Sequence, residues 1–161
     1  MIGQNNILNI RTSSGFTWNG QTGSTRGFAD FESIELCRRA GAYLLMRSYR
    51  KAGCKTIDSV IRRWAPATEN DTENYIRFVS KLSGLPSTAK LCFDNDYASI
   101  LAAMEIMENG YVAKRRETHF ENARVAYLDT MKVKVNWLQL GVEIIRLILA
   151  ALAGGAAAGT I

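Results

Sequence analysis

Residues 56–76, TIDSVIRRWAPATENDTENYI, contain the start and stop signals of two helices. Thr56 is a good N-cap, and the apolar residues that follow it at helical spacing end before Pro66, whose ring disfavours helical backbone at the preceding residue. Asn70 or Asp71 caps the next helix, because acidic residues then fall in its first turn, where the helix dipole favours them. The stretch therefore predicts a short helix, a connection and a second amphipathic helix.

Helical spacing continues on both sides of this stretch. Upstream, apolar residues recur at steps of three and four over 33–52, which predicts one long helix. Downstream, the third helix runs to Gly84, and a fourth opens at Asp94 or Asn95 and stops at Gly110. The apolar faces expected to form the core contain Leu44, Ile61, Val79 and Leu101.

The N-terminal 30 residues have a different pattern, rich in Gly, Asn, Thr and Ser with apolar residues between turn signals. Asn19-Gly20 is a strong hairpin cue, because a type I′ turn needs positive φ at both central positions. A small N-terminal β-hairpin or an irregular loop is expected here. Together with the four helices, it gives a mainly α fold class, formally α+β.

Composition excludes several classes of protein. The 161 residues have ordinary apolar (47%) and charged (22%) fractions, which argue for a packed core and against disorder or a collagen-like chain. Cys37, Cys54 and Cys92 show no CxxC spacing and occur with only one histidine, His119, so no metal site, cofactor or disulfide framework is expected. No basic segment followed by an apolar one opens the chain, so Sec-type export is not expected.

Charge gives a weaker signal. The net charge of +5 favours anionic surroundings such as a cell wall, phospholipid or nucleic acid. No motif for phosphate binding or specific nucleic-acid recognition is present. Basic residues occur in pairs, among them Arg38-Arg39 and Arg62-Arg63, which are expected on solvated helix faces.

The composition changes after the fourth helix. Residues 111–134 are highly charged and are expected to form a connecting helix, whereas 135–161 are apolar apart from Glu143, Arg146 and a few uncharged polar residues. At about 1.5 Å per residue, a helix over 135–161 is long enough to cross a roughly 30 Å hydrocarbon core. This segment is expected to contact a membrane or to associate with copies of itself. Residues 1–110 form the main domain in this division.

Short sequence motifs in residues 1–110, called words below, resemble those of a known family. They are Asn5-Asn6, Asn9-Ile10-Arg11, Trp18–Gly23, Gly27–Phe31, Thr56-Ile57, Arg63–Pro66, Glu69–Ile76 and Glu108-Asn109-Gly110. In these words the chain resembles phage and prophage virion structural proteins that have a muralytic, lysozyme-like domain. In a circularly permuted order, the same words are similar to those of flagellar-type glucosaminidases.

The resemblance implies a lysozyme-like fold directed at peptidoglycan, whose cleavage between sugars needs a carboxylic acid that protonates the glycosidic oxygen. Glu108 is the predicted catalytic acid, because it ends an apolar helix, the partly desolvated setting that such an acid needs. A lytic transglycosylase needs no second carboxylate, since the N-acetyl group and 6-hydroxyl of the substrate do the remaining work. Glu32 and Glu69 are rival acids, and the alternative for Glu108 is an exposed position in the last helical turn.

The predicted substrate-binding residues are Tyr75, Trp64, Trp18 and Asn70. Aromatic rings stack on sugar faces but also dominate protein cores, so each of the three aromatic residues either lines a groove or packs internally. Tyr75 lies on the apolar face of its helix, which favours packing. Asp71 is expected to cap a helix and not to catalyse.

Two functions fit these observations. The first is a virion-associated, peptidoglycan-degrading protein of the lytic transglycosylase type, acting locally at the bacterial cell envelope while the genome enters. The second is a non-enzymatic virion structural or ejection protein that binds the wall or a membrane through an inactive domain and the apolar tail. The expected partners are peptidoglycan, other virion proteins, and a membrane or a second copy through 135–161. Altered family words, such as a segment 5–11 without the usual proline and glycine, leave both functions open.

Overall fold

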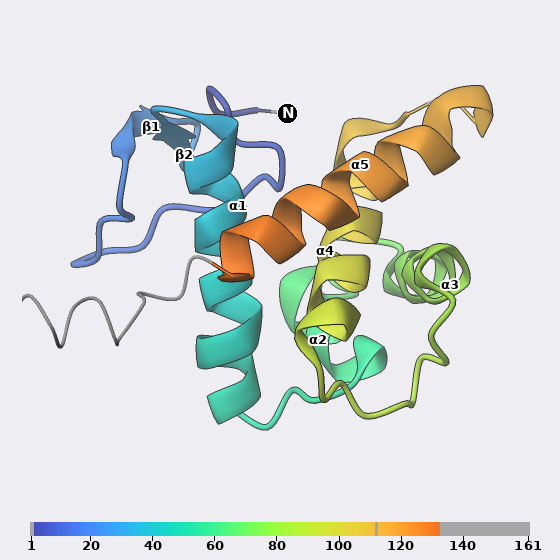
Figure 1. Cartoon of the computed structure of the whole chain (residues 1–161). Helices are drawn as coiled ribbons and strands as arrows, with labels where there is room; N and C mark the ends of the chain where they lie inside the picture. The colour runs from blue at the N-terminus through green and yellow to red at the C-terminus, as the bar shows by residue number, and fades with distance from the viewer. Residues whose placement is uncertain (1, 112, 133–161) are drawn as a thin grey trace, which may run out of the picture. The chain divides into compact units, whose positions relative to one another are not determined.

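The computed structural model of the chain describes residues 2–111 and 113–132 (Figure 1). In chain order its elements are β1 (Gln21–Thr25), β2 (Phe28–Phe31), α1 (Ile34–Tyr43), the π-helical segment η1 (Leu44–Tyr49), α2 (Ile57–Trp64), α3 (Thr72–Ser83), α4 (Asp94–Asn109) and α5 (Ala113–Lys132). The predicted mainly helical class with a small N-terminal sheet is confirmed. The apolar helix predicted over 135–161 lies outside the described residues, and among the described helices none is both long and apolar enough to span a bilayer.

The N-terminal sheet is an antiparallel hairpin of β1 and β2. Its two-residue turn is Arg26-Gly27, with φ of 53° and 82°, and not the Asn-Gly pair at 19–20. A type I′ turn needs positive φ at both central residues, which glycine adopts readily and arginine adopts here. Alternate residues of β2, Ala29 and Phe31, are fully buried, so one face of the hairpin covers the core.

The helix ends follow the local signals. Thr56 caps α2 in a capping box with Ser59, and the Asp71 carboxylate accepts the backbone N–H of residue 74 at the start of α3. Helices α3 and α4 end at Gly84 and Gly110, which both adopt the left-handed conformation with φ of 72° and 62°. The predicted caps and stops of these helices are confirmed, because each depends on residues adjacent in sequence.

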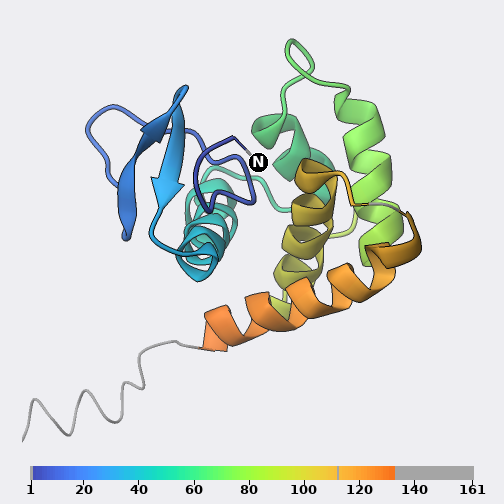
Figure 2. The ribbon, with the colours of Figure 1, turned by 90° about the horizontal axis from the view of Figure 1, so that it is seen from above.

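Helix α4 lies at the centre of the helical part, with α1, α3 and α5 around it (Figure 2). Every residue of α4 from Tyr97 to Ile106 is buried. Three of the predicted core residues, Ile61, Val79 and Leu101, are fully buried, whereas Leu44 is only half-buried. Leu44 is less buried because it faces the cavity described below.

Helix α5 packs as part of this compact unit, which extends from Met1 to Met131. Phe120, Ala123, Tyr127 and Met131 are buried against the other helices. These four positions recur at steps of three and four and therefore lie on one face of the helix. The high charge that suggested a connecting helix over 111–134 occupies its other faces.

One basic pair departs from the expected solvated position. The Arg38 guanidinium lies between α1 and α4 and donates to both oxygens of Glu105, with Nε–Oε2 of 3.1 Å and Nη2–Oε1 of 2.9 Å. The two side chains are only 17% and 6% exposed. Arg39, by contrast, is exposed as expected. Adjacent residues point in different directions around a helix, so a basic pair does not share one environment.

Candidate active site

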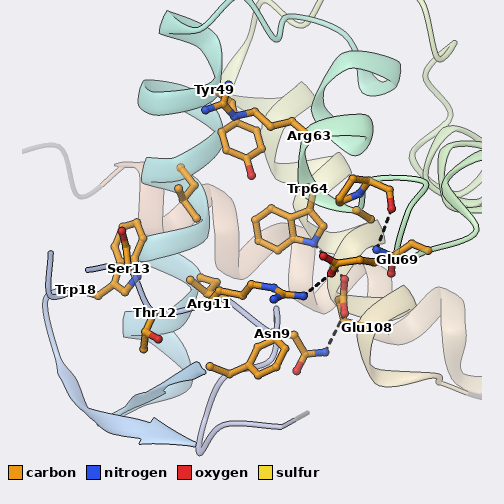
Figure 3. Close-up of a pocket in the computed structure, with 16 residues that line it drawn as sticks. Asn9, Arg11, Thr12, Ser13, Trp18, Tyr49, Arg63, Trp64, Glu69 and Glu108 are labelled. Carbon is orange, nitrogen blue, oxygen red and sulfur yellow. Dashed lines mark hydrogen bonds and ion pairs between the residues drawn. The ribbon is translucent and has the colours of Figure 1, made fainter. Parts of the chain in front are cut away.

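An open cavity of about 610 Å³ lies between the N-terminal loop and the helices (Figure 3). Its walls come from the N-terminal loop, η1, the end of α2, the α2–α3 loop and the end of α4. The lining residues are Asn9, Ile10, Arg11, Thr12, Ser13, Trp18, Phe28, Leu44, Tyr49, Arg63, Trp64, Ala65, Pro66, Glu69, Asn70 and Glu108. Segments that are 99 residues apart in the sequence, at Asn9 and Glu108, therefore meet at one site.

The Glu108 carboxylate is half-buried in this cavity and accepts three hydrogen bonds. Asn9 Nδ2 donates to Oε2 at 2.8 Å. Trp64 Nε1 and the Tyr75 hydroxyl donate to Oε1 at 3.1 Å and 2.8 Å. A carboxylate has two acceptor positions on each oxygen, so Oε1 is fully used and Oε2 keeps one position open. The alternative of a freely exposed glutamate in the last helical turn is therefore wrong.

Two asparagines fix the N-terminal loop against the end of α4. The fully buried Asn6 donates to the carbonyls of Ile10 and Ala29 at 2.8 and 2.7 Å, and its Oδ1 accepts the Ile10 N–H at 2.8 Å. Asn109, next to the carboxylate, donates to the Ile7 carbonyl at 2.8 Å. With the loop held at both ends, Asn9 adopts a left-handed conformation, with φ of 49°, and reaches Glu108.

Of the two roles that the sequence left open for Tyr75, the structure shows internal packing. Its ring is buried in the helical core, with 5% of the residue exposed, while its hydroxyl reaches Glu108. Burial raises the pKa of Tyr75 well above its usual value, and the neighbouring negative charge of Glu108 adds to the effect. The hydroxyl therefore stays protonated and acts as a donor to the carboxylate. Tyr75 does not line the cavity.

Aromatic rings form much of the remaining wall. Trp64, at the end of α2, meets Tyr49 of η1 edge to face, with ring centroids 6.4 Å apart. Trp18 lines the cavity farther from Glu108 and packs edge to face on Phe16, with centroids 4.7 Å apart. Two of the three aromatic residues predicted to bind substrate, Trp64 and Trp18, thus lie in the same cavity as Glu108.

The remaining polar residues that the sequence singled out differ in whether they line the cavity. Glu69 lines the cavity and forms an exposed ion pair with Arg11 at 2.6 Å, whereas Glu32 is not among the lining residues. Asn70 also lines the cavity, beside Glu69. Asp71 caps α3, as expected. Of the three candidate acids, Glu108 alone combines partial burial with side-chain donors to both oxygens in the described part of the chain.

Sequence reasoning assigned no role to four cavity residues: Asn9, Arg11, Tyr49 and Arg63. Asn9, Arg11 and Arg63 belong to motifs of the resemblance, so these motifs were visible, although the contacts of Asn9 with Glu108 and of Arg11 with Glu69 were not. Tyr49 gave no signal, because its spacing is that of any residue on a buried helix face. Among the described residues, no group of His, Cys, Asp or Glu side chains lies close enough to hold a metal ion.

This arrangement is suited to proton transfer on a ligand with both polar and flat apolar faces. The Glu108 carboxylate lies at one end of the cavity, its orientation set by three protein donors, and aromatic rings line the space beside it. Carbohydrates match such a lining, because their ring faces stack on aromatic side chains and their hydroxyls form hydrogen bonds.

No protein-family model matches the chain. Protein P5 of Pseudoalteromonas phage PM2 is 42% identical to it over 110 residues, which cover 66% of this chain and 68% of that protein. The similarity to a bacteriophage protein supports the phage part of the prediction. This degree of identity across about two thirds of each chain shows common descent. The chain therefore belongs to the family of protein P5 of Pseudoalteromonas phage PM2.

Proposed function

We propose that this phage protein binds glycan strands of peptidoglycan in the cavity and cleaves them, with Glu108 as the acid. The observation that carries the proposal is the Glu108 carboxylate, oriented by Asn9, Trp64 and Tyr75 in an open cavity with aromatic walls. Preorganised groups of this kind catalyse proton transfer efficiently, because little reorganisation is needed when the substrate binds.

In the proposed reaction, a sugar ring stacks on Trp64, which brings the glycosidic oxygen to Glu108. The proton to be transferred sits on Oε2, since Oε1 already accepts two hydrogen bonds. Glu108 protonates the glycosidic oxygen, and the bond from that oxygen to C1 breaks. The leaving sugar departs with the new hydroxyl group.

The second half of the reaction needs no further protein carboxylate. The 6-hydroxyl of the sugar that contains C1, and not of the leaving sugar, attacks C1 and closes a 1,6-anhydro ring. The proton of this hydroxyl passes to the Glu108 carboxylate, which restores the acid. The N-acetyl group of the sugar stabilises positive charge at C1 during the exchange. A hydrolase would instead need a second carboxylate to activate water, and Glu69 is the lining residue of that type.

Zymography of the full chain against bacterial cell walls, followed by mass analysis of the released sugars, tests this function. We expect Glu108→Gln to abolish wall degradation with little change in melting temperature, because the amide keeps the shape of the side chain but has no proton to donate to the leaving oxygen. Glu32→Gln, outside the cavity, is the control and keeps full activity. A 1,6-anhydro product identifies a transglycosylase.

Other results would contradict the proposal. Full activity of Glu108→Gln, together with inactivity of Glu69→Gln, would transfer the acid role to Glu69. If the wild-type chain degrades no wall at all, the enzymatic proposal fails.

A non-enzymatic wall-binding protein is the second candidate. It is favoured by the ion pair between Arg11 and Glu69, two lining residues, at 2.6 Å. That pair engages the second carboxylate of the cavity and leaves the site better suited to holding a glycan than to hydrolysing it. In this case the chain sediments with purified cell walls and releases no soluble sugar.

For location, we propose the virion, in contact with other virion proteins; the similarity to a phage protein supports this. The protein would then act at the cell envelope when the genome enters. Residues 135–161 would supply contact with a membrane or with a second copy. The support is their sequence: burying apolar side chains such as Leu138, Ile144 and Leu147 is worth about 1.5–3 kcal/mol each, which outweighs the cost of Glu143 and Arg146.

A further inference from the structure

The charged residues that line the cavity are unequally neutralised. They are two arginines, Arg11 and Arg63, and two glutamates, Glu69 and Glu108. Arg11 forms its ion pair with Glu69, and Glu108 accepts hydrogen bonds from three neutral donors. In the described part of the chain, Arg63 makes no ion pair with a carboxylate. The ion pair therefore leaves one positive charge, Arg63, and one negative charge, Glu108, in the cavity without an oppositely charged partner.

Arg63 is held in place although it lacks an acidic partner. Its guanidinium carbon lies 4.9 Å from the centroid of the Tyr49 ring, within cation–π distance. Burial raises the pKa of Tyr49, so its hydroxyl stays neutral and does not compensate the charge. A guanidinium has five N–H donors in a planar fork, so donors that are not engaged with Tyr49 can bind a planar anion such as a carboxylate.

The preceding residue shows the contrast. Arg62 lies outside the cavity and forms ion pairs with Asp58 at 2.9 Å and with Glu73 at 2.7 Å, which link α2 to α3. Two adjacent arginines at the end of one helix thus have different environments. Arg62 is neutralised by the protein, whereas Arg63 faces the cavity.

The position of Arg63 relative to Glu108 is set by the aromatic residues between them (Figure 3). Trp64 donates to Glu108 with its ring nitrogen and lies edge to face with Tyr49, and the Arg63 guanidinium lies over the Tyr49 ring. A sugar stacked on Trp64 would therefore have Glu108 on one side and the Arg63 guanidinium on the other. A carboxylate on that sugar or on its neighbour would meet Arg63.

We propose that Arg63 is a subsite for a carboxylate attached to the bound glycan, which makes the cavity selective for acidic cell-wall glycans over neutral N-acetylglucosamine chains. This inference rests on the proposed glycan binding but not on catalysis. The carboxylate has two sources in peptidoglycan: the lactyl group of a denuded strand, or the stem peptide of a substituted one. Both offer the same planar anion.

Calorimetric titration of the full chain tests the subsite, with Glu108→Gln as the background to prevent turnover. Three ligands are compared: N-acetylchitotetraose, the denuded peptidoglycan tetrasaccharide with free lactyl groups, and the same tetrasaccharide with tripeptides. Glu108→Gln is expected to bind at least one acidic ligand more tightly than N-acetylchitotetraose. Adding Arg63→Gln should weaken that acidic ligand by about ten-fold or more, as expected for loss of a charge-assisted contact, and leave N-acetylchitotetraose unchanged.

Arg62→Gln is the matched control, because it removes the same charge from the adjacent residue outside the cavity, and it should leave the preference for acidic ligands intact. Arg63→Lys should restore part of the affinity, since it keeps the charge but not the planar fork. An equal loss for neutral and acidic ligands, an equal effect of Arg62→Gln, or no binding of any ligand would overturn the proposal. A wild-type chain that binds acidic glycans through Arg63 and cleaves none refutes the proposed enzymatic function alone.

Discussion

Asn6 is a fully buried amide that uses both of its ends, and it shows how one residue positions the candidate site. Its two donors meet backbone carbonyls of the N-terminal loop and of β2, and its acceptor meets a backbone N–H. Each bond is short, between 2.7 and 2.8 Å. Backbone groups that lie inside a protein need partners. The Asn6 side chain therefore adds to the backbone hydrogen bonds, such as Ala29 N–H to the Ile10 carbonyl at 2.9 Å, that hold the loop against β2.

Asn6→Asp is expected to destabilise the protein strongly. The substitution keeps the shape but removes both donors, which leaves the buried carbonyls of Ile10 and Ala29 facing a carboxylate. The Ile10 carbonyl keeps the Ala29 N–H as a donor, so the main cost is a buried carboxylate that faces two carbonyl oxygens. Burial of such an ill-paired polar group costs about 1–3 kcal/mol, and more when it is charged, so the free energy of unfolding should fall by roughly 3 kcal/mol or more in urea titrations. Asn5→Asp, at a half-buried amide that also donates to two carbonyls, is the control and should cost less. Equal effects would show that burial of Asn6 is unimportant.

The buried thiol of Cys37 is expected to lower the free energy of unfolding at alkaline pH. Burial raises the pKa of its thiol from 9.0 to about 12. The unfolded chain loses this proton near pH 9 while the folded chain keeps it, so the stabilisation is complete below pH 9 and declines as the pH rises toward 12. Between these values the wild type should lose about 1.4 kcal/mol per pH unit more than Cys37→Ala. Urea unfolding at pH 9, 10 and 11 measures how the free energy of unfolding changes with pH. Cys92→Ala, at an exposed thiol, is the control. Parallel slopes for wild type and Cys37→Ala would contradict the prediction.

At the scale of elements, α1 and α4 are joined by one buried ion pair. Arg38 and Glu105 make two hydrogen bonds, and the Arg38 guanidinium also lies 5.7 Å from the ring of Tyr127 on α5. Three helices therefore meet at a single charged group. Buried pairs of this kind contribute little net stability, but the loss of one partner leaves an uncompensated charge.

Glu105→Gln is expected to lower the free energy of unfolding by about 3–5 kcal/mol, because Arg38 then stays buried without a counter-charge. The double substitution Arg38→Met with Glu105→Leu should recover much of this loss. Asp58→Asn, which breaks the exposed pair with Arg62, is the control and should cost less than about 1 kcal/mol. A double variant as unstable as Glu105→Gln would show that the pair itself, and not the unpaired charge, sets the stability.

Helix α5 shows how an element can be present in the sequence pattern without its role being clear. Eight of its 20 residues are charged, which suggested a connecting segment. Four residues at helical spacing nevertheless suffice to attach it to the core. The sequence did not show this narrow apolar face clearly, because charged residues on the other faces of the helix dominate the composition of the segment.

At the scale of the whole molecule, the compact unit ends at Met131 and not at Gly110. A chain ending at Gly110 loses Phe120, Tyr127 and Met131, whose burial is worth about 1.5–3 kcal/mol each. This sum is comparable to the total stability of many domains, so that chain should unfold at much lower urea concentration, or fail to fold cooperatively, while a chain ending at Met131 keeps the core. Circular dichroism during urea unfolding of both chains measures this.

The same two chains and the full chain form one series. Sedimentation velocity and liposome flotation should show a lipid-free monomer for the chain ending at Met131, and self-association or lipid binding for the full chain. Equal stability of the two shorter chains would restore the boundary near Gly110, and a full chain that stays monomeric and lipid-free would contradict the proposed role of 135–161.

The sequence by itself determined the features that depend on neighbouring residues. Caps, glycine stops and apolar spacing located α2, α3 and α4, because helix signals act within one or two turns. The family words brought attention to Glu108 and to the N-terminal asparagines. The hairpin was predicted but its turn was misplaced, since several glycine-containing pairs compete and only strand pairing selects Arg26-Gly27.

Only the tertiary structure decided which distant groups meet. Asn9 and Glu108 are 99 residues apart, and Arg38 and Glu105 are 67 apart, yet both pairs form direct hydrogen bonds. Periodicity shows which face of a helix is buried but not which side chain of another element packs against that face. For the same reason, the sequence predicts one environment for the pair Arg62-Arg63. In the structure, Arg62 forms ion pairs with Asp58 and Glu73, whereas Arg63 lines the cavity.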